Sequence, residues 1–244
     1  AVVGVNLVLK DPIGTIKTNV SGTEIILESA NIYGKKVIIT SSSEIYGRGV
    51  NKEFSENDDR IMGPVKNSRW SYACTKAMDE FLAFAYHIKK GLPIVISRLF
   101  NTIGSRQSAH YGMVVPNFVQ QALKNKDLTV FGDGKQTRCF CNVDDVVNAL
   151  IILGLSEKAN GEVFNIGSSD EISILNLASK IIGITNSKSK IKLVPYTEAY
   201  GKGFEDMKRR KPNIDKIKNN FQWEPKISLY ESLLQIIEES KNNL

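Results

Sequence analysis

Tyr72 and Lys76 are two residues whose types and spacing could together perform acid–base chemistry. Residues four apart on a helix lie on one face, with Cβ atoms roughly 5–6 Å apart. An ammonium group held there favours the charged form of a neighbouring phenol and lowers its pKa from about 10. Tyr72 would then be a general base near neutral pH. Taken alone, such a pair is more often the solvent-facing side of an amphipathic helix, so the surrounding sequence has to decide.

The segments around this pair follow the pattern of a parallel α/β sheet. Apolar spacing predicts helices over residues 11–32 and 72–90, and apolar, β-branched runs at 36–40 and 94–99 predict buried strands. Strand, helix and strand at this spacing imply right-handed βαβ units. The polar residues 41–47 follow the first strand directly, at the edge where open α/β sheets bind ligands.

Beyond residue 101 the sequence predicts shorter, mixed elements. Strands are expected over 128–131 and 163–166, and helices over 114–124, 142–155, 173–183 and 228–239. Ser173 is a candidate cap for the third of these helices.

The composition is that of an ordinary soluble globular protein, with 42% hydrophobic and 24% charged residues among 244. No apolar run has membrane-spanning length and no signal segment is visible, so we expect a cytoplasmic protein. The net charge of +6 is scattered, which favours a polyanionic small ligand over nucleic acid. Three cysteines and two histidines do not make up a zinc ligand set, so we expect free, buried or half-buried thiols and no metal.

Five sequence blocks occur in one order along the chain. They are Ser42-x-x-x-Tyr46-Gly47, Tyr72-x-x-x-Lys76, Arg98-Leu99-Phe100-Asn101-Thr102-Ile103-Gly104, Gly132-Asp133-Gly134-x-Gln136-Thr137-Arg138 and Trp223-Glu224-Pro225. Together they resemble the extended short-chain dehydrogenase/reductase family, the NAD-dependent nucleotide-sugar epimerases, dehydratases and decarboxylases. The resemblance covers essentially the whole chain and makes the Tyr72–Lys76 pair a catalytic one.

The resemblance implies an α/β fold, with a Rossmann-like doubly wound parallel sheet and a smaller C-terminal substrate-binding α/β domain. The expected NAD-binding domain covers residues 1–101 plus 143–165, and the nucleotide-sugar domain covers 102–142 plus 166–244. Family members begin with a strand, a G-x-x-G-x-x-G turn and a helix that cradle the cofactor pyrophosphate, and this glycine turn does not occur here. We therefore expect the first strands, roughly 60–80 residues, to be missing. By itself this fragment should bind NAD weakly or not at all and be inactive.

The chemistry implied by the resemblance is a transient oxidation of the sugar at C4, with hydride passing to NAD. Tyr72 would take the proton of the C4 hydroxyl, and Lys76 would hold the nicotinamide ribose and lower the pKa of Tyr72. Ser42 matches the serine or threonine that hydrogen-bonds the C4 oxygen and relays its proton.

Four further residues match substrate-binding positions of the family. Asn101 and Arg138 would bind the nucleotide diphosphate, a suitable task for an amide and a planar guanidinium. Phe131 would pack near the base, and Arg210 would lie near the diphosphate or the C5 substituent. Each has a structural alternative: a hydrogen bond for Asn101 and Arg138, core packing for Phe131, and a solvated basic run for Arg210.

Ser43 and Glu44 bear on the reaction that follows C4 oxidation. The 4,6-dehydratases have an Asp-Glu pair here, and Ser43 lacks the acid. A Ser-Glu pair, together with Arg69-Trp70 and Arg210-Lys211-Pro212, resembles the UDP-glucuronate decarboxylases. We therefore expect decarboxylation of UDP-glucuronate, with Glu44 catalytic and Ser43 binding substrate. The alternative is a UDP-glucose-type 4-epimerase, and a 4,6-dehydratase or a catalytically silent relative fits less well.

A UDP-sugar is the expected ligand, and a second copy of the chain is the expected protein partner. In this family two helices from each subunit commonly form a four-helix dimer core. The candidates here are the helices predicted over residues 11–32 and 72–90.

Overall fold

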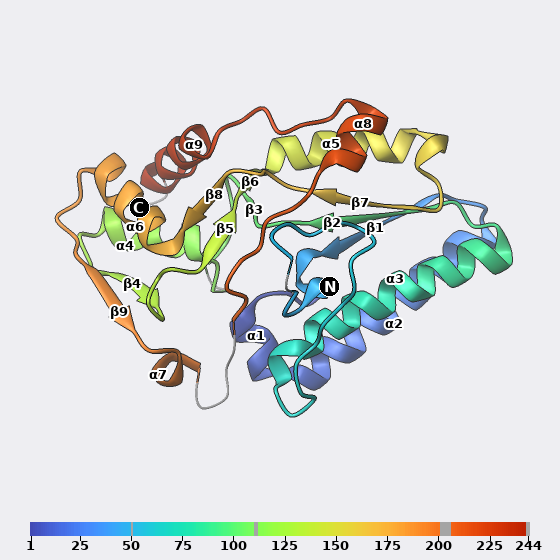
Figure 1. Ribbon diagram of the computed structural model, residues 1–244, viewed down its shortest axis with the longest axis horizontal. Helices are drawn as coiled ribbons and strands as arrows, with labels where there is room; N and C mark the ends of the chain where they lie inside the picture. The colour runs from blue at the N-terminus through green and yellow to red at the C-terminus, as the bar shows by residue number, and fades with distance from the viewer. Residues whose placement is uncertain (50, 110–111, 201–205, 243–244) are drawn as a thin grey trace.

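A three-stranded parallel sheet organises the first part of the fold (Figure 1). The computed structural model describes residues 1–49, 51–109, 112–200 and 206–242. The strands, in spatial order, are β1 (Val37–Ser42), β2 (Ile94–Leu99) and β7 (Glu162–Ile166). Helices α2 (Pro12–Ile32) and α3 (Ser71–Lys90) cover one face, and α5 (Val143–Leu155) covers the other. The predicted doubly wound parallel sheet is therefore confirmed.

The central strand β2 is buried on both faces because successive side chains of a strand point in opposite directions. Ile94 and Ile96 pack with Ala83 of α3, whereas Val95 packs with Leu153 of α5. A strand covered on both faces is an almost continuous apolar run, which is why the sequence pattern located β2 with the bounds that the structure has.

A local signal fixes the C-terminal end of α3. The helix follows the 3₁₀ turn η2 (Ser68–Trp70) and ends at Gly91, whose φ of 70° is left-handed. Glycine adopts this conformation without a Cβ clash, and its N–H donates to the carbonyl oxygen of His87 at 2.9 Å. Tyr72 is therefore the second residue of the helix, at its N-terminal end.

A buried ion pair between Glu80 of α3 and Arg98 of β2 ties this helix to the sheet. Glu80 Oε1 accepts from Ser41 Oγ at 2.6 Å and from Arg98 Nε at 3.0 Å. Arg98 Nη1 donates to Tyr46 Oη at 3.0 Å, and that hydroxyl donates to Asn165 Oδ1 of β7 at 2.7 Å. Removing one partner from a buried pair of this kind costs about 3–5 kcal/mol. The network therefore holds α3 firmly against the carboxyl end of β1.

The remainder of the chain packs around a separate apolar core. Helices α4 (Val114–Leu123), α6 (Ile174–Thr185) and α9 (Leu229–Asn242) contribute Val119, Leu177 and Leu233 to it. Two small sheets lie beside these helices: β4 (Leu128–Phe131) runs parallel to β9 (Ile191–Val194), and β5 (Thr137–Cys139) runs antiparallel to β8 (Glu171–Ser173). Ser173 caps α6 as predicted, accepting from the N–H of Asn176 at 3.1 Å.

Several short elements were not predicted from the sequence. They are α1 (Val5–Lys10), η1 (Ser43–Tyr46), η4 (Glu157–Ala159), α7 (Tyr196–Tyr200), α8 (Asp215–Phe221) and the strands β3, β5, β6, β8 and β9. Segments this short contain too few residues to show the repeat of a helix or a strand. Strands β3 (Thr102–Ile103) and β6 (Cys141–Asn142) pair where the two predicted domains would meet. The division into domains stays a prediction.

The Trp223-Glu224-Pro225 block fastens the C-terminal segment to α5. Trp223 Nε1 donates to the carbonyl oxygen of Asp145 at 3.2 Å. The Asp145 carboxylate accepts from the backbone N–H groups of Lys226 and Ile227 at 3.0 and 2.9 Å. This block therefore serves the fold, away from the residues predicted to be catalytic.

Candidate active site

A cavity of about 540 Å³ opens at the carboxyl ends of β1 and β2, between the sheet and the second part of the chain. Eight of the nine predicted site residues line it, namely Ser42, Ser43, Glu44, Tyr72, Asn101, Phe131, Arg138 and Arg210. Lys76 is not among the lining residues that the structure describes. Positions as distant in the sequence as Ser42 and Arg210 thus share one cavity, as the resemblance implied.

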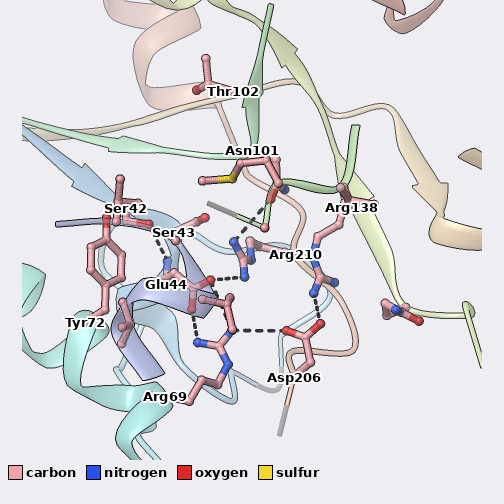
Figure 2. Close-up of a pocket in the computed structure, with 18 of the residues that line it drawn as sticks. Ser42, Ser43, Glu44, Arg69, Tyr72, Asn101, Thr102, Arg138, Asp206 and Arg210 are labelled. Atoms are coloured by element: carbon pink, nitrogen blue, oxygen red, sulfur yellow. Dashed lines mark hydrogen bonds and ion pairs between the residues drawn. The ribbon is translucent and has the colours of Figure 1, made fainter. Parts of the chain in front are cut away.

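Tyr72 projects from the first turn of α3 toward Ser42 at the end of β1 (Figure 2). The Ser42 hydroxyl hydrogen-bonds Tyr72 and accepts from the backbone N–H of Glu44 at 3.2 Å. Burial, with the nearby charge of Glu44, raises the pKa of Tyr72 to about 12, although the Ser42 hydrogen bond and Arg210 oppose the rise. Tyr72 is therefore a protonated phenol at neutral pH in this structure.

In this structure Lys76 does not lower the pKa of Tyr72. Lys76 is buried, and its ammonium donates to Asp79 Oδ2 at 2.8 Å, one turn further along the same helix. A carboxylate at that distance neutralises the positive charge that would otherwise stabilise a phenolate. Helical spacing places Lys76 one turn from Tyr72, and the same spacing places Asp79 three residues after Lys76, a neighbour that the sequence interpretation did not weigh.

Glu44 lies between two arginines, beside Tyr72 and Ser42. Arg69 of η2 donates from Nη1 to Glu44 Oε2 at 2.6 Å and from Nη2 to Oε1 at 3.3 Å, and Arg210 Nη2 also donates to Oε1. Burial opposes ionisation of Glu44, but Arg210 and Arg69 outweigh it and hold the pKa of this carboxyl well below its usual range. Glu44 is thus a fixed negative charge and cannot serve as a proton donor near neutral pH.

The sequence interpretation missed Asp206, a second carboxylate in the cavity. Asp206 Oδ2 accepts from Arg138 Nη2 at 2.8 Å, and Oδ1 accepts from Arg69 Nη2 at 3.3 Å. Arg69 belongs to the Arg69-Trp70 motif but is not among the predicted site residues. No local pattern marks Asp206, because its partners lie 68 and 137 residues away in the sequence.

The remaining predicted residues lie around these charges. Arg210 Nη1 donates to Asn101 Oδ1 at 3.4 Å, and Asn101 Nδ2 donates to the carbonyl oxygen of Cys139 at 3.2 Å. Ser43 is fully buried, and its hydroxyl has no hydrogen-bond partner among the described residues. Phe131 packs edge-on against Tyr200, with ring centroids 5.2 Å apart. Figure 2 shows Tyr72 and Arg138 on opposite sides of the cavity, with Glu44 and Arg210 between them.

The residues near Tyr72 suit the nicotinamide end of NAD. The apolar side chains of Val3 and Val8 line the same cavity as Ser41 and Ser42, so the cavity offers a flat ring both apolar and hydroxyl contacts. Lys76 would have to leave Asp79 to reach a ribose.

Other features of the described residues bear on function. Within them, no three His, Cys, Asp or Glu side chains come together as a metal site, and no helix has the length and apolar character needed to cross a membrane. All three cysteines are free thiols, as expected. Cys139 and Cys141 are buried, but Cys74 is exposed, whereas a buried or half-buried thiol was expected there.

The chain is similar to known nucleotide-sugar enzymes over almost all of its length. Residues 1–236 match the family model described as GDP-mannose 4,6 dehydratase. The chain is 44% identical to UDP-N-acetyl-alpha-D-glucosaminuronate decarboxylase of Bacillus cytotoxicus, covering 98% of this chain and 74% of that protein. It is 37% identical to UDP-glucuronic acid decarboxylase 1 of Arabidopsis thaliana, covering 96% of this chain and 52% of the relative.

Solved structures show the same likeness. The chain superposes on UDP-glucose 4-epimerase of Thermotoga maritima, crystallised with UDP-glucose, with a TM-score of 0.89, 27% identity and coverage of 100% of this chain and 75% of the other. For UDP-glucuronic acid 4-epimerase of Bacillus cereus, crystallised with UDP-glucuronic acid and NAD, the TM-score is 0.83, the identity 28% and the coverage 94% and 69%. The chain thus spans between about half and three quarters of the length of the proteins it resembles.

Proposed function

The chain belongs to the extended short-chain dehydrogenase/reductase family of NAD-dependent nucleotide-sugar epimerases and dehydratases, and on this basis we propose that it decarboxylates a UDP-uronic acid through a transient 4-keto sugar. The observation that carries the proposal is the convergence of Arg69 and Arg210 on Glu44 beside Tyr72. A UDP-sugar needs cations at its diphosphate, and Arg138 supplies one at the far side of the cavity. Two more guanidinium groups at the catalytic end suit a ligand with a further carboxylate on C5.

In the proposed first step, Tyr72 removes the proton of the C4 hydroxyl, and Ser42 hydrogen-bonds the same oxygen and relays the proton. NAD, when bound, accepts the hydride from C4 and later returns it. Lys76 would hold the nicotinamide ribose after leaving Asp79, and its ammonium would then favour the phenolate of Tyr72.

The proposed second step follows from the C4 ketone. The C5 carboxylate is then part of a β-keto acid, so the C5–C6 bond can break with its electron pair passing into a C4–C5 enolate. Carbon dioxide leaves, and C5 takes a proton before C4 is reduced again. Arg210 suits the reacting carboxylate, since its contacts to Asn101 and Glu44 leave other N–H groups of the fork available. Glu44 fixes both arginines by pairing with them.

Epimerisation at C4 is the second candidate, since it needs the same oxidation by Ser42 and Tyr72 and the fold closely matches two 4-epimerases. Dehydration is disfavoured because Ser43 offers no carboxylic acid and Glu44 is held ionised. A catalytically silent relative is disfavoured by the placement of Ser42 and Tyr72 in one cavity.

Product mass separates the two candidates. The full-length protein, loaded with NAD, is incubated in parallel with UDP-glucuronate, UDP-N-acetylglucosaminuronate and UDP-glucose. We expect at least one uronate to lose the mass of carbon dioxide and UDP-glucose to keep its mass and configuration. Conversion of UDP-glucose to an isomer, with both uronates retaining their carboxyl carbon, would reject decarboxylation in favour of epimerisation.

We also propose that two copies of the chain associate through α2 and α3, which pack side by side (Figure 1). Met78, Phe81 and Ile88 share one exposed face of α3, and Ile25 and Ile32 one exposed face of α2. Clustered apolar side chains of this kind mark interaction surfaces, and closed two-fold dimers are the commonest assembly.

Introducing a charge on this surface should prevent dimerisation. Ile25→Glu would force a carboxylate into the interface, so we expect sedimentation velocity to find a monomer where the unmodified chain is a dimer. Leu193→Glu is the matched control, because Leu193 is 54% exposed on β9, outside these helices. A dimer that persists in Ile25→Glu, or an unmodified chain that is monomeric at micromolar concentration, would contradict the proposal.

A further inference from the structure

Five charged side chains form one series of alternating sign across the cavity (Figure 2). In order they are Arg138, Asp206, Arg69, Glu44 and Arg210, and each is joined to the next by an ion pair. The series links the side of the cavity opposite Tyr72 to the catalytic end. The proposed function gives a role to Arg138, Arg69, Glu44 and Arg210, but none to Asp206.

Asp206 holds its place through both carboxylate oxygens. Beyond its two arginine contacts, Oδ1 accepts from the backbone N–H of Met207 at 2.8 Å and Oδ2 accepts from Tyr196 Oη at 3.3 Å. Burial opposes ionisation, but Arg138 and Arg69 outweigh it and hold the pKa of Asp206 below its ordinary value. The side chain is therefore an anchored anion between two cations.

The Asp206 segment also determines how Arg138 is oriented. Arg138 Nη1 donates to the carbonyl oxygens of Thr137 and Met207, both at 2.8 Å, while Nη2 donates to Asp206. A guanidinium is planar and carries five N–H groups, so contacts along one side of the fork fix the direction of the rest. Asp206 also offsets the positive charge of Arg138 in a cavity that holds two further arginines, Arg69 and Arg210.

We propose that Asp206 is a positioning residue for the diphosphate of the substrate: it holds Arg138 so that the remaining N–H groups of that guanidinium bind phosphate oxygens. The inference rests on the proposed function, because it requires a nucleoside diphosphate in this cavity. Asp206 acts through Arg138 and does not itself contact the ligand, since two anions in contact would repel.

The test compares UDP with uridine, which has the same base and ribose but no diphosphate. In the full-length protein loaded with NAD, calorimetry should find that Asp206→Asn binds UDP about tenfold more weakly than the unmodified protein, whereas the affinity for uridine should change by less than about twofold. A purely structural role would weaken both ligands alike. Glu162→Gln is the matched control, because Glu162 pairs with Lys216 outside the cavity and should leave both affinities unchanged.

Two further variants complete the design. In an Arg138→Met background, Asp206→Asn should cause no additional loss of UDP affinity, since it acts through Arg138. If Asp206→Asn does not fold, Asp206→Glu keeps the charge but displaces it, and a UDP-selective loss is again expected. Tighter UDP binding by Asp206→Asn would overturn the proposal, because it would make the carboxylate a competitor of the phosphates. Equal losses for UDP and uridine, or no loss, would overturn it too. Failure of the unmodified protein to bind UDP would instead count against the proposed function.

Discussion

Replacing Tyr72 with phenylalanine is expected to lower turnover of the full-length protein loaded with NAD by about 10²- to 10⁴-fold. The change removes only the hydroxyl that would take the C4 proton and keeps the ring that packs at the start of α3. UDP affinity should therefore stay within about twofold, because a group used only in the reaction contributes little to ground-state binding. Steady-state kinetics and calorimetry on the same preparations measure both quantities. Turnover within a factor of ten of the unmodified protein would remove Tyr72 from the mechanism.

The same variant tests the protonation state of Tyr72 in the absence of ligands. An ordinary tyrosine is half ionised at about pH 10, whereas burial raises the pKa of Tyr72 to about 12. The tyrosinate absorption of the unmodified protein minus that of Tyr72→Phe should therefore stay flat through pH 10. Because the folded protein holds this proton more tightly than the unfolded chain, the phenol stabilises the fold fully below about pH 10, and this contribution is lost as the pH rises through the folded-state value. An absorbance step centred at or below pH 10 would contradict the burial argument.

Glu44→Gln should impair both activity and stability. The amide keeps the shape of the side chain but leaves the buried Arg210 without its ion-pair partner and Arg69 with Asp206 alone, so we expect the free energy of unfolding to fall by about 3–5 kcal/mol. Turnover with a UDP-uronate should fall by about 10²-fold or more, because the arginines beside the reacting carboxylate lose their common anchor. Urea unfolding and the carbon dioxide assay measure the two effects.

The stability difference caused by Glu44→Gln should depend on pH with a definite sign. The two arginines hold the pKa of Glu44 below its usual range in the folded protein. A carboxyl whose pKa is lowered by folding stabilises the folded protein at every pH above its pKa in the unfolded chain, which is about 4.3. This stabilisation is lost as the pH falls through the pKa that the carboxyl has in the folded protein. The difference in unfolding free energy between the unmodified protein and Glu44→Gln should thus be largest at neutral pH and become smaller in acid. Glu171→Gln, which breaks an exposed pair, should change stability by no more than about 1 kcal/mol. A Glu44→Gln protein as stable as the unmodified one at neutral pH would show that the charge is not needed to hold the arginines.

Long, strongly patterned segments were the parts of the fold that the sequence could predict. The β-branched run of β2 is a local signal, because burial on both faces imposes its pattern directly on consecutive residues. The apolar spacing of α2 located the helix but not its buried face, because Ile13 and Ile25 are exposed in the structure. Strands such as β5 and β8 gave no such signal. They exist because residues 137–139 meet residues 171–173, and neither segment is long enough to show a period alone.

The resemblance identified the family and pointed to nine site residues, eight of which line the cavity, but it did not separate ligand contacts from structural ones. Arg98 and Tyr46 stand in the same blocks as Asn101 and Ser42, and both are buried in the hydrogen-bond network around Glu80. Asn101 and Arg138 line the cavity while also bonding backbone carbonyls. A motif records that a residue type is needed, whereas the direction of its side chain depends on neighbours from other strands and helices.

The sequence by itself determined the α/β fold, the chemistry-bearing pair at the start of α3, and the identity of the serine and glutamate that follow β1. Only the tertiary structure decided that Tyr72 keeps its proton and which carboxylates pair with the arginines of the cavity. Burial keeps Tyr72 protonated, and Asp206 pairs with Arg138 and Arg69, which lie 68 and 137 residues away in the sequence. Burial and long-range ion pairs depend on distances in space, and no local spacing in the sequence encodes them.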